Sequence, residues 1–295
     1  MSMDNLIDGR AIAEQIHSET KSRVKALAAR GVQPRLVFIR VGEDPASRVY
    51  VGMKEKKSAE LGIHSTTTTL PKDTTQDDLL KLISQLNADS FVHAILVQAP
   101  LPKHISEAIV FATVSAMKDV DGFHPENVGK LMLGDDTGFK PCTPAGVHEL
   151  LIRSQVETSG AQVVVLGRGN IVGKPMTAIL CQKAEHANAT VTLCHSRTKN
   201  IAEHCRQADI IIAAMGVAEF VKADMVRETA VVIDVGVNRI TDNTRPKGYR
   251  LVGDIDFANV QPKVRLITPN PGGVGPMTIA MLMQNTVRAA ECATR

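Results

Sequence analysis

Short, nearly unbroken runs of β-branched and other apolar residues alternate along this chain with segments of helical periodicity. Residues 36–41, 92–97 and 162–166 are such runs, and each is followed by a segment long enough for a helix. Strands that are buried on both faces of a parallel sheet have this composition, and helices make the crossovers between them. The alternation therefore predicts an α/β fold built on parallel sheets.

The other expected elements follow from the same periodicities and from capping residues. Thr75 and Asp78 form a capping signature before one helix, and Thr143 followed by Pro144 suits the N-cap and first residue of another. Further strands are expected near residues 63–69, 190–194, 209–214, 230–235 and 265–268. Helices are expected at residues 10–29, between Gly42 and Gly62, after Thr75, from Pro144 and from Pro276.

The length of the chain predicts two domains. Its 295 residues lie near the size at which a single hydrophobic core stops growing. The least periodic stretch, from about 113 to 141, is the expected crossing between the domains. We therefore expect one α/β domain from residues 1–140 plus 276–295. A second domain, residues 141–275, is expected to be a Rossmann-type doubly wound parallel sheet.

Charge and cysteine content narrow the class of protein. The formal charge is only +3 and the basic residues are scattered, so nucleic acid is not an expected partner. The N-terminus lacks the pattern of a signal peptide and no run of about twenty apolar residues occurs, so neither export nor a membrane span is expected. Five cysteines without C-x-x-C spacing suggest neither a disulfide framework nor a zinc site. A reducing, cytoplasmic location fits best.

A glycine-rich turn follows the strand expected at 162–166. Gly167, Gly169 and Gly173 form GxGxxxG at the opening of a helix, one residue longer than the usual dinucleotide fingerprint. Glycine lets the backbone approach a pyrophosphate, and the free N–H groups at a helix start favour negative charge. The alternative is an ordinary strand-to-helix turn that uses glycine for its conformation.

The end of the next strand discriminates between the two nicotinamide cofactors. An NAD-binding protein commonly presents Asp or Glu there to the ribose hydroxyl. This chain has His195, Ser196 and Arg197 instead, and Arg168 lies in the glycine turn. Arginines would attract the extra phosphate of NADP, so NADP is expected rather than NAD, unless these arginines are merely solvated surface charges. Gly216 and the segment 234–238 end later strands, where ligands lie in open parallel sheets.

The first domain contains a possible proton-transfer group. Ser47, Tyr50 and Lys54 recur at helical spacing and so share one face of a predicted helix. A tyrosine beside a lysine could shield the ammonium group from water and help it accept and return protons, although such pairs are more often surface contacts. Gln98 ends a strand and Asp121 lies in a glycine-flanked turn, where each could face a ligand. Gln98 could equally cap the strand end, and Asp121 could equally form the turn.

Seven segments taken together are much more specific than any one of them. They are PASRVYVGMKEK, ILVQAPLP, KDVDGFHPENVGK, PCTPAGV, GRGNIVGKP, DVGVN and PGGVGPMT. In this order and with this spacing, from Asp8 to about residue 285, the chain resembles the bifunctional methylenetetrahydrofolate dehydrogenase/cyclohydrolase family. The resemblance implies NADP-dependent oxidation of 5,10-methylenetetrahydrofolate and hydrolysis of the product to 10-formyltetrahydrofolate, in one-carbon metabolism and purine biosynthesis. It also implies a cleft between a folate-binding and an NADP-binding domain, a homodimer, and no metal.

Residue roles are carried over by the same resemblance. Lys54 matches the general acid/base, Gln98 the residue that bonds to and tunes it, Tyr50 a residue that packs on the folate rings, and Asp121 the partner of the pterin's amino edge. The implied folate site comprises Ser47, Tyr50, Lys54, Gln98, Pro100, Leu101, Asp121, Gly272, Gly273 and Pro276. The implied NADP site comprises Gly167, Arg168, Gly169, Asn170, Ile171, Val172, His195, Ser196, Arg197, Ala214, Met215, Gly216, Val237 and Thr278.

Three positions depart from the family's pattern. Gly169 replaces a serine, Ala99 stands where leucine is common, and Asn270 stands where a small apolar residue is frequent. Loss of the serine hydroxyl would weaken one cofactor hydrogen bond by about 0.5–1.5 kcal/mol, unless Asn170 substitutes. Two other functions stay open: a dehydrogenase for another small substrate, and a non-catalytic NADP-binding sensor.

Overall fold

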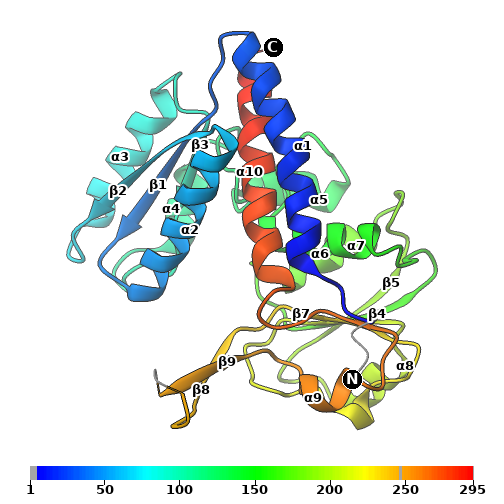
Figure 1. Ribbon diagram of the computed structural model, residues 1–295. Helices are drawn as coiled ribbons and strands as arrows, with labels where there is room; N and C mark the ends of the chain where they lie inside the picture. The colour runs from blue at the N-terminus through cyan, green and yellow to red at the C-terminus, as the bar shows by residue number, and fades with distance from the viewer. Residues whose placement is uncertain (1–4, 246–247, 295) are drawn as a thin grey trace. The chain divides into compact units, whose positions relative to one another are not determined.

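The computed structural model describes residues 5–245 and 248–294, which divide into two compact units (Figure 1). The Lys54 unit comprises residues 14–142 and the described residues from Ile279 onward. The glycine-loop unit comprises residues 143–278 together with the described residues up to Ala13. The unit boundaries fall inside α1 (Gly9–Ala29) and α10 (Val274–Ala293), and just after the first residue of α6 (Cys142–Arg153).

The Lys54 unit is built on a three-stranded parallel sheet, which confirms the expected α/β class. Its strand order is β2-β1-β3, with β1 at Arg35–Val41, β2 at His64–Leu70 and β3 at Ala94–Val97. The central strand β1 is buried beyond its first residue, whereas the edge strand β2 is partly exposed along its length. The helices of this unit outside the boundary helices are α2 (Pro45–Leu61), α3 (Gln76–Ala88), α4 (Glu107–Thr113) and α5 (Pro125–Leu133).

Local signals fix the ends of the helices that flank this sheet. The Asp44 carboxylate accepts the N–H of Ser47 at the start of α2, and left-handed Gly62 ends that helix. Thr75 accepts the N–H of Asp78, as its capping signature predicted. These caps matter for function because they set where α2 begins, and hence which of its side chains face the carboxyl end of the sheet.

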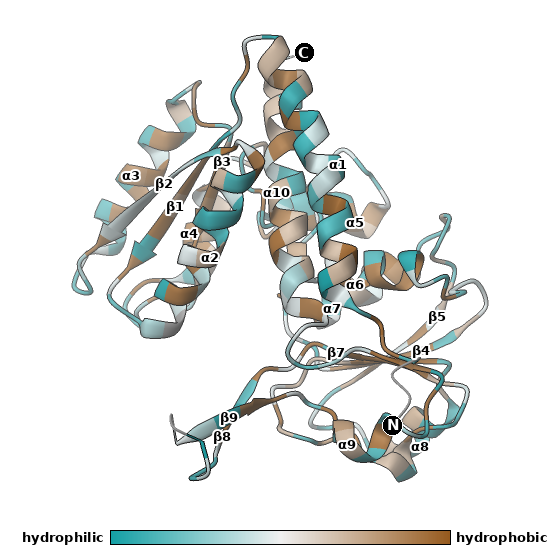
Figure 2. Ribbon diagram, viewed as in Figure 1, coloured by the Kyte–Doolittle hydropathy of each residue, from teal (hydrophilic) through white to brown (hydrophobic). Residues whose placement is uncertain are grey.

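The glycine-loop unit contains a five-stranded, wholly parallel sheet in the order β10-β7-β6-β4-β5. The strands are β4 (Gln162–Leu166), β5 (Thr190–Cys194), β6 (Ile210–Ala213), β7 (Val231–Asp234) and β10 (Leu266–Ile267). In chain order this is the doubly wound arrangement 2-1-3-4-5, which reverses between β4 and β6 and places a ligand there. β4 and β7 are largely apolar, and both are mostly brown in Figure 2. The expected doubly wound parallel sheet is confirmed.

The N-terminal segment lies at the edge of this five-stranded sheet. Leu6 bridges Ile267 in parallel, and Ile7 donates its N–H to the carbonyl of Ile267 at 2.9 Å. The expected domain division had placed residues 1–140 in the other domain. The difference has a physical cause, because the pairing is with a strand about 260 residues later and leaves no local sequence pattern.

Several elements differ from the sequence expectations. The stretch 113–141 contains helix α5, and the antiparallel hairpin β8 (Asn238–Thr241) and β9 (Tyr249–Val252) was not expected. α6 begins at Cys142 and α10 at Val274, so Thr143 is not an N-cap and Pro276 does not open its helix.

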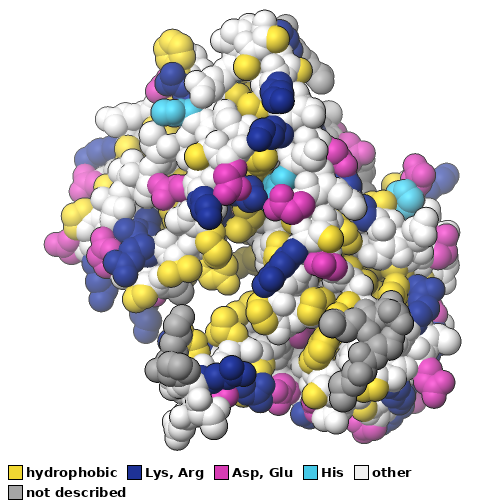
Figure 3. Space-filling model, in the orientation of Figure 1, with side chains coloured by type: hydrophobic (Ala, Val, Ile, Leu, Met, Phe, Trp, Pro, Cys, Tyr) yellow, Lys and Arg dark blue, Asp and Glu magenta, His cyan; other side chains and the backbone are white. Residues whose placement is uncertain are grey.

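None of the helices in the described part of the chain is long and apolar enough to cross a membrane. On the face drawn in Figure 3, basic and acidic side chains are interspersed.

Candidate active site

A buried lysine bonded to a glutamine forms the centre of the candidate site. Lys54 lies on α2 with only 7% of its surface exposed, and its Nζ donates to Oε1 of Gln98 at 3.0 Å. Gln98 directly follows β3, where its own N–H bonds to the carbonyl of Ile39 on β1. Its Nε2 donates to the carbonyl of Ala99 at 2.7 Å, which fixes the amide so that oxygen faces the lysine. The pair therefore lies at the carboxyl ends of β1 and β3, where this sheet reverses its order.

Asp121 is the acidic member of the site. It lies two residues beyond Asp119, which forms a parallel bridge with Ile95 of β3, and it is half-buried. Burial raises the pKa of Asp121, while the positive charge of Lys54 lowers it. The structure thus brings together Lys54, Gln98 and Asp121, three groups that were named from the sequence as separate features.

Two supporting side chains were missed in the sequence. Asn285 of α10 donates its amide to the carbonyl of Val120 at 2.8 Å, and the Cys142 thiol donates to the same carbonyl. Together they hold the backbone that presents Asp121. The sequence signal that could have identified Asn285 is its position as a polar residue within the apolar stretch of α10, because a buried amide must find hydrogen-bond partners. Gly122 completes the turn, since a Cβ there would lie 2.6 Å from the nitrogen of Pro141.

The remaining expected folate residues fall into two groups. Ser47 is buried and Tyr50 is 43% exposed, on the same helix as Lys54. Pro100 is exposed and Leu101 is partly buried just after Gln98, with the Leu101 N–H donated to Glu107. The second group belongs to the glycine-loop unit and comprises the turn residues Gly272 and Gly273 and, in the first turn of α10, Pro276.

The glycine loop of β4 packs directly against the end of β6. Gly167 has a φ of +112°, and a Cβ there would lie 2.1 Å from the carbonyl oxygen of Ala214. A Cβ on Gly173 would lie 1.8 Å from the carbonyl oxygen of Gly167, so the loop folds tightly back on the start of α7 (Gly173–Leu180). Gly169, by contrast, has nothing within 4 Å of that position. The loop therefore has two structural glycines and one that leaves open space.

The surroundings of this loop suit a phosphorylated dinucleotide. The side chains of Arg168, Ser196 and Arg197 are exposed. Among the described residues, neither arginine forms an ion pair, so both guanidinium groups are available to phosphate. His195 begins a turn in which its N–H bonds to the Thr198 hydroxyl and its Nδ1 accepts the N–H of Arg197. The residues present therefore fit NADP, and no acidic group occupies the end of β5.

The other expected cofactor residues lie on neighbouring segments. Asn170 accepts a hydrogen bond from Lys174 at 2.8 Å, so its oxygen is already engaged. Thr278 forms a hydroxyl–hydroxyl hydrogen bond with Thr143 at 3.0 Å. The rest comprise the loop residues Ile171 and Val172, the residues Ala214, Met215 and Gly216 after β6, and exposed Val237 just before β8.

Asp234, the last residue of β7, is almost fully buried. Burial raises its pKa to about 7, and the neighbouring Asp254 carboxylate adds to the rise. The folded chain therefore holds this proton to about pH 7, whereas an unfolded chain releases it near pH 4. The contribution of Asp234 to the free energy of unfolding should therefore be largest below about pH 4. It should fall by about 2–4 kcal/mol as the pH rises from there through 7.

Urea unfolding at several pH values between 5 and 8 would measure this effect. Asp234→Asn should show a smaller decrease than the native chain over this range. Equal pH dependence in both proteins would contradict the raised pKa.

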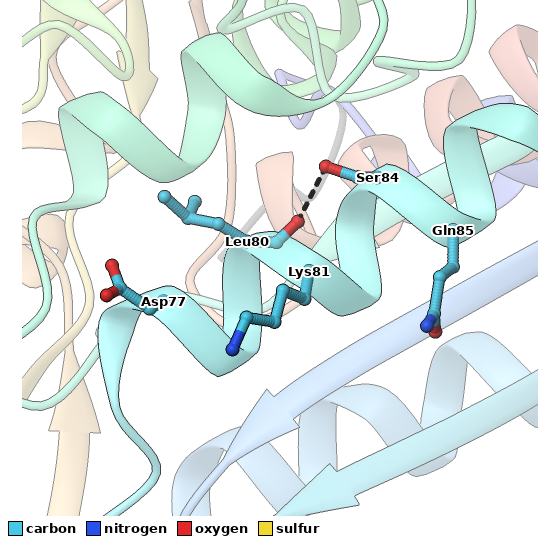
Figure 4. Close-up of a pocket in the computed structure, with 5 residues that line it drawn as sticks. All are labelled: Asp77, Leu80, Lys81, Ser84 and Gln85. Atoms are coloured by element: carbon cyan, nitrogen blue, oxygen red, sulfur yellow. Dashed lines mark hydrogen bonds between the residues drawn. The ribbon is translucent and has the colours of Figure 1, made fainter.

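A hollow along α3 lies apart from these groups. It is lined by Asp77, Leu80, Lys81, Ser84 and Gln85, which Figure 4 shows as successive side chains of one helix. The hydrogen bond drawn there joins the Ser84 hydroxyl to the backbone of Leu80. No polar groups from different elements converge in it, so it is not a candidate active site.

Two family models match the chain. The catalytic domain of tetrahydrofolate dehydrogenase/cyclohydrolase matches residues 7–121, and the NAD(P)-binding domain of the same family matches residues 141–294. A curated relative, the bifunctional protein FolD of Chlorobium chlorochromatii, is 54% identical over 288 residues, covering 97% of this chain and 98% of the relative. The FolD of Salinibacter ruber is 51% identical over 287 residues, covering 97% of this chain and 96% of that relative.

Solved structures agree with these matches. The bifunctional FolD methylenetetrahydrofolate dehydrogenase/cyclohydrolase of Campylobacter jejuni superposes with a TM-score of 0.92 at 46% identity, covering 97% of this chain and 98% of that one. The Trypanosoma brucei enzyme, complexed with NADP cofactor and inhibitor, has a TM-score of 0.92 at 39% identity and 98% coverage of both chains. The resemblance drawn from the sequence motifs is confirmed.

Proposed function

This chain belongs to the tetrahydrofolate dehydrogenase/cyclohydrolase family, and we propose that it is a bifunctional, NADP-dependent enzyme of one-carbon metabolism. It oxidises 5,10-methylenetetrahydrofolate to 5,10-methenyltetrahydrofolate and hydrolyses that product to 10-formyltetrahydrofolate, which can supply purine biosynthesis. The observation that carries this proposal is the buried Lys54, bonded to Gln98 beside Asp121, in a chain that matches the family over nearly its whole length.

Lys54 is proposed to move protons in the hydrolytic step. The methenyl carbon is already cationic, so water needs only a base that accepts its proton as the C–O bond forms. Lys54, in its neutral amine form, accepts that proton and returns it to the ring nitrogen as the C–N bond breaks. The remaining hydroxyl proton passes to solvent as the formyl C=O bond forms. Gln98 positions the lysine through its side-chain oxygen, and Asp121 pairs with the amino edge of the pterin. Tyr50, exposed one turn before Lys54, provides an aromatic surface for the folate rings.

The glycine-loop unit is proposed to hold the cofactor at the carboxyl ends of β4, β5 and β6. Bound NADP supplies the hydride acceptor for the oxidation. The chain's own contribution is positional: Gly167 lets the glycine loop pack closely against Ala214 at the end of β6, and Arg168, Ser196 and Arg197 contact the 2′-phosphate.

We expect the enzyme to prefer NADP over NAD by at least about tenfold in kcat/KM, roughly 1.4 kcal/mol. The reason is that the end of β5 presents Arg197 and a serine hydroxyl but no carboxylate. Initial rates with each cofactor, at saturating methylenetetrahydrofolate, would measure the ratio. Equal efficiency with the two cofactors would refute this assignment.

The first test of function is a spectrophotometric assay with 5,10-methylenetetrahydrofolate and NADP. It follows NADPH formation and, after acid quenching, the methenyl product. Turnover that requires both substrates is the expected result. Turnover of a simple hydroxy acid but not of the folate would instead establish another dehydrogenase, and NADP binding without any product would establish a sensor.

The assembly and location are further parts of the proposal. By its resemblance to the family, the enzyme is a homodimer formed through the glycine-loop unit, which sedimentation at working concentration would test. A reducing cytoplasm suits the five cysteines, all of which are free thiols.

A further inference from the structure

A wholly buried carboxylate organises the loop that follows β6. Asp254 has no exposed surface, and its Oδ2 accepts the backbone N–H groups of Met215 and Gly216 at 2.6 and 2.9 Å. Its Oδ1 accepts the N–H of Val217 at 2.9 Å and the side-chain amide of Asn238 at 2.8 Å. Three consecutive backbone donors thus converge on one internal anion, an arrangement that usually receives an anionic ligand.

The surrounding backbone leaves room for this carboxylate. A Cβ on Gly236 would lie 2.1 Å from Oδ1 of Asp254, so a side chain there would displace it. The N–H of Asp254 bonds in turn to Asp234 at the end of β7, and Gly216 adopts a φ of +67° within the loop. The carboxylate therefore joins the segments that follow β6, β7 and β9.

The loop that follows β6 lies beside the glycine loop of β4. The carbonyl of Ala214 makes the close approach to Gly167, and the N–H of Ala214 bonds to Leu166 at 2.8 Å. Residues 215–217 therefore continue directly from the point where the parallel sheet reverses its strand order, between β4 and β6. A shift of these residues would change the shape of the cofactor site without altering any phosphate-binding side chain.

We propose that Asp254 is a positioning residue for NADP: its carboxylate holds the backbone of residues 215–217 in the conformation that receives the cofactor. This inference rests on the proposed function. Because the three N–H groups are engaged by Asp254, the loop has none of them to offer to a phosphate. It contributes carbonyl oxygens and apolar surface instead, which suit the uncharged part of the cofactor. Phosphate recognition is then left to the loops after β4 and β5.

The test compares Asp254→Asn with the native chain. Asparagine has the same shape, but its NH₂ group would replace one of the acceptor oxygens and would face backbone N–H donors. We expect the Kd for NADP, measured by calorimetry, to rise at least tenfold, and amide hydrogen exchange in residues 215–217 to accelerate. In the dehydrogenase assay the KM for NADP should rise while the KM for methylenetetrahydrofolate stays within twofold.

Asp256→Asn is the matched control. It removes the same charge two residues later, where the carboxylate bonds to Lys222 and Asn259 rather than to the loop. Its Kd for NADP should equal that of the native chain. A Kd within twofold of native in Asp254→Asn, even with a lowered melting temperature, would show a merely structural role and overturn the proposal.

Asn238→Ala serves if Asp254→Asn does not fold. It removes one of the four donors and leaves the carboxylate in place, so a smaller rise in the Kd for NADP, about two- to fivefold, is expected, with faster exchange at residues 215–217. An unchanged Kd would again overturn the proposal. A native chain that binds NADP but oxidises no folate would refute the proposed function while leaving the role of Asp254 intact.

Discussion

Lys54→Ala is expected to reduce hydrolysis of 5,10-methenyltetrahydrofolate by about 10²- to 10⁴-fold, the usual contribution of a positioned proton-transfer group. The methyl side chain leaves Gln98 and Asp121 in place but removes the nitrogen that would accept the proton from water. Folate binding should be largely retained, because Tyr50 and Asp121 still provide the ring contact and the carboxylate. The decay of added methenyltetrahydrofolate, measured without NADP, reports this step alone.

Lys56→Ala is the appropriate control for this substitution. Lys56 lies on the same helix two residues later and is exposed, so its loss tests for nonspecific effects of removing a lysine from α2. It should hydrolyse the methenyl compound at the native rate. If Lys54→Ala did so as well, the assignment of Lys54 as the proton-transfer group would be wrong. If Lys54→Ala instead lost folate affinity as completely as hydrolysis, its role would be in binding.

The centre of the candidate site was predictable because each member carries a local signal. Helical spacing placed Tyr50 and Lys54 on one face, and the apolar strand before Gln98 placed that residue at a strand end. In an open parallel sheet, carboxyl ends of strands and the helices that follow them converge, so these positions were expected to be near a ligand. The 3.0 Å bond between Lys54 and Gln98 was not predictable from spacing, and only the family resemblance suggested it.

Residues whose roles depend on distant partners were not found. Asn285 contacts Val120 from 165 positions away, and Asp254 contacts residues 37–39 positions earlier. No periodic pattern in the sequence marks either residue, and an aspartate that follows a glycine is typical of a turn. The N-terminal residues that pair with Ile267 were misplaced for the same reason. Sequence patterns specify elements and their exposed faces, whereas buried polar contacts between elements require the fold.

Gly167→Ala is expected to impair the dehydrogenase while sparing the hydrolytic step. The new Cβ would meet the carbonyl oxygen of Ala214 at 2.1 Å, in a backbone conformation, φ +112°, that alanine rarely adopts. Strain and overpacking together should amount to about 2 kcal/mol or more, so the KM for NADP should rise at least about 30-fold. The hydrolytic residues Lys54, Gln98 and Asp121 belong to the other unit.

Gly169→Ala separates this steric effect from a general effect of removing glycine. The two positions are in the same loop, but a Cβ on Gly169 meets nothing within 4 Å and its φ is not positive. It should therefore bind NADP within about threefold of native, a free-energy change below about 0.7 kcal/mol. Equal losses in Gly167→Ala and Gly169→Ala would mean that NADP itself excludes side chains from the whole loop. In that case the close approach of the cofactor would require glycine at Gly169 as well. The packing of Gly167 against Ala214 would then not be the reason why this loop contains glycines.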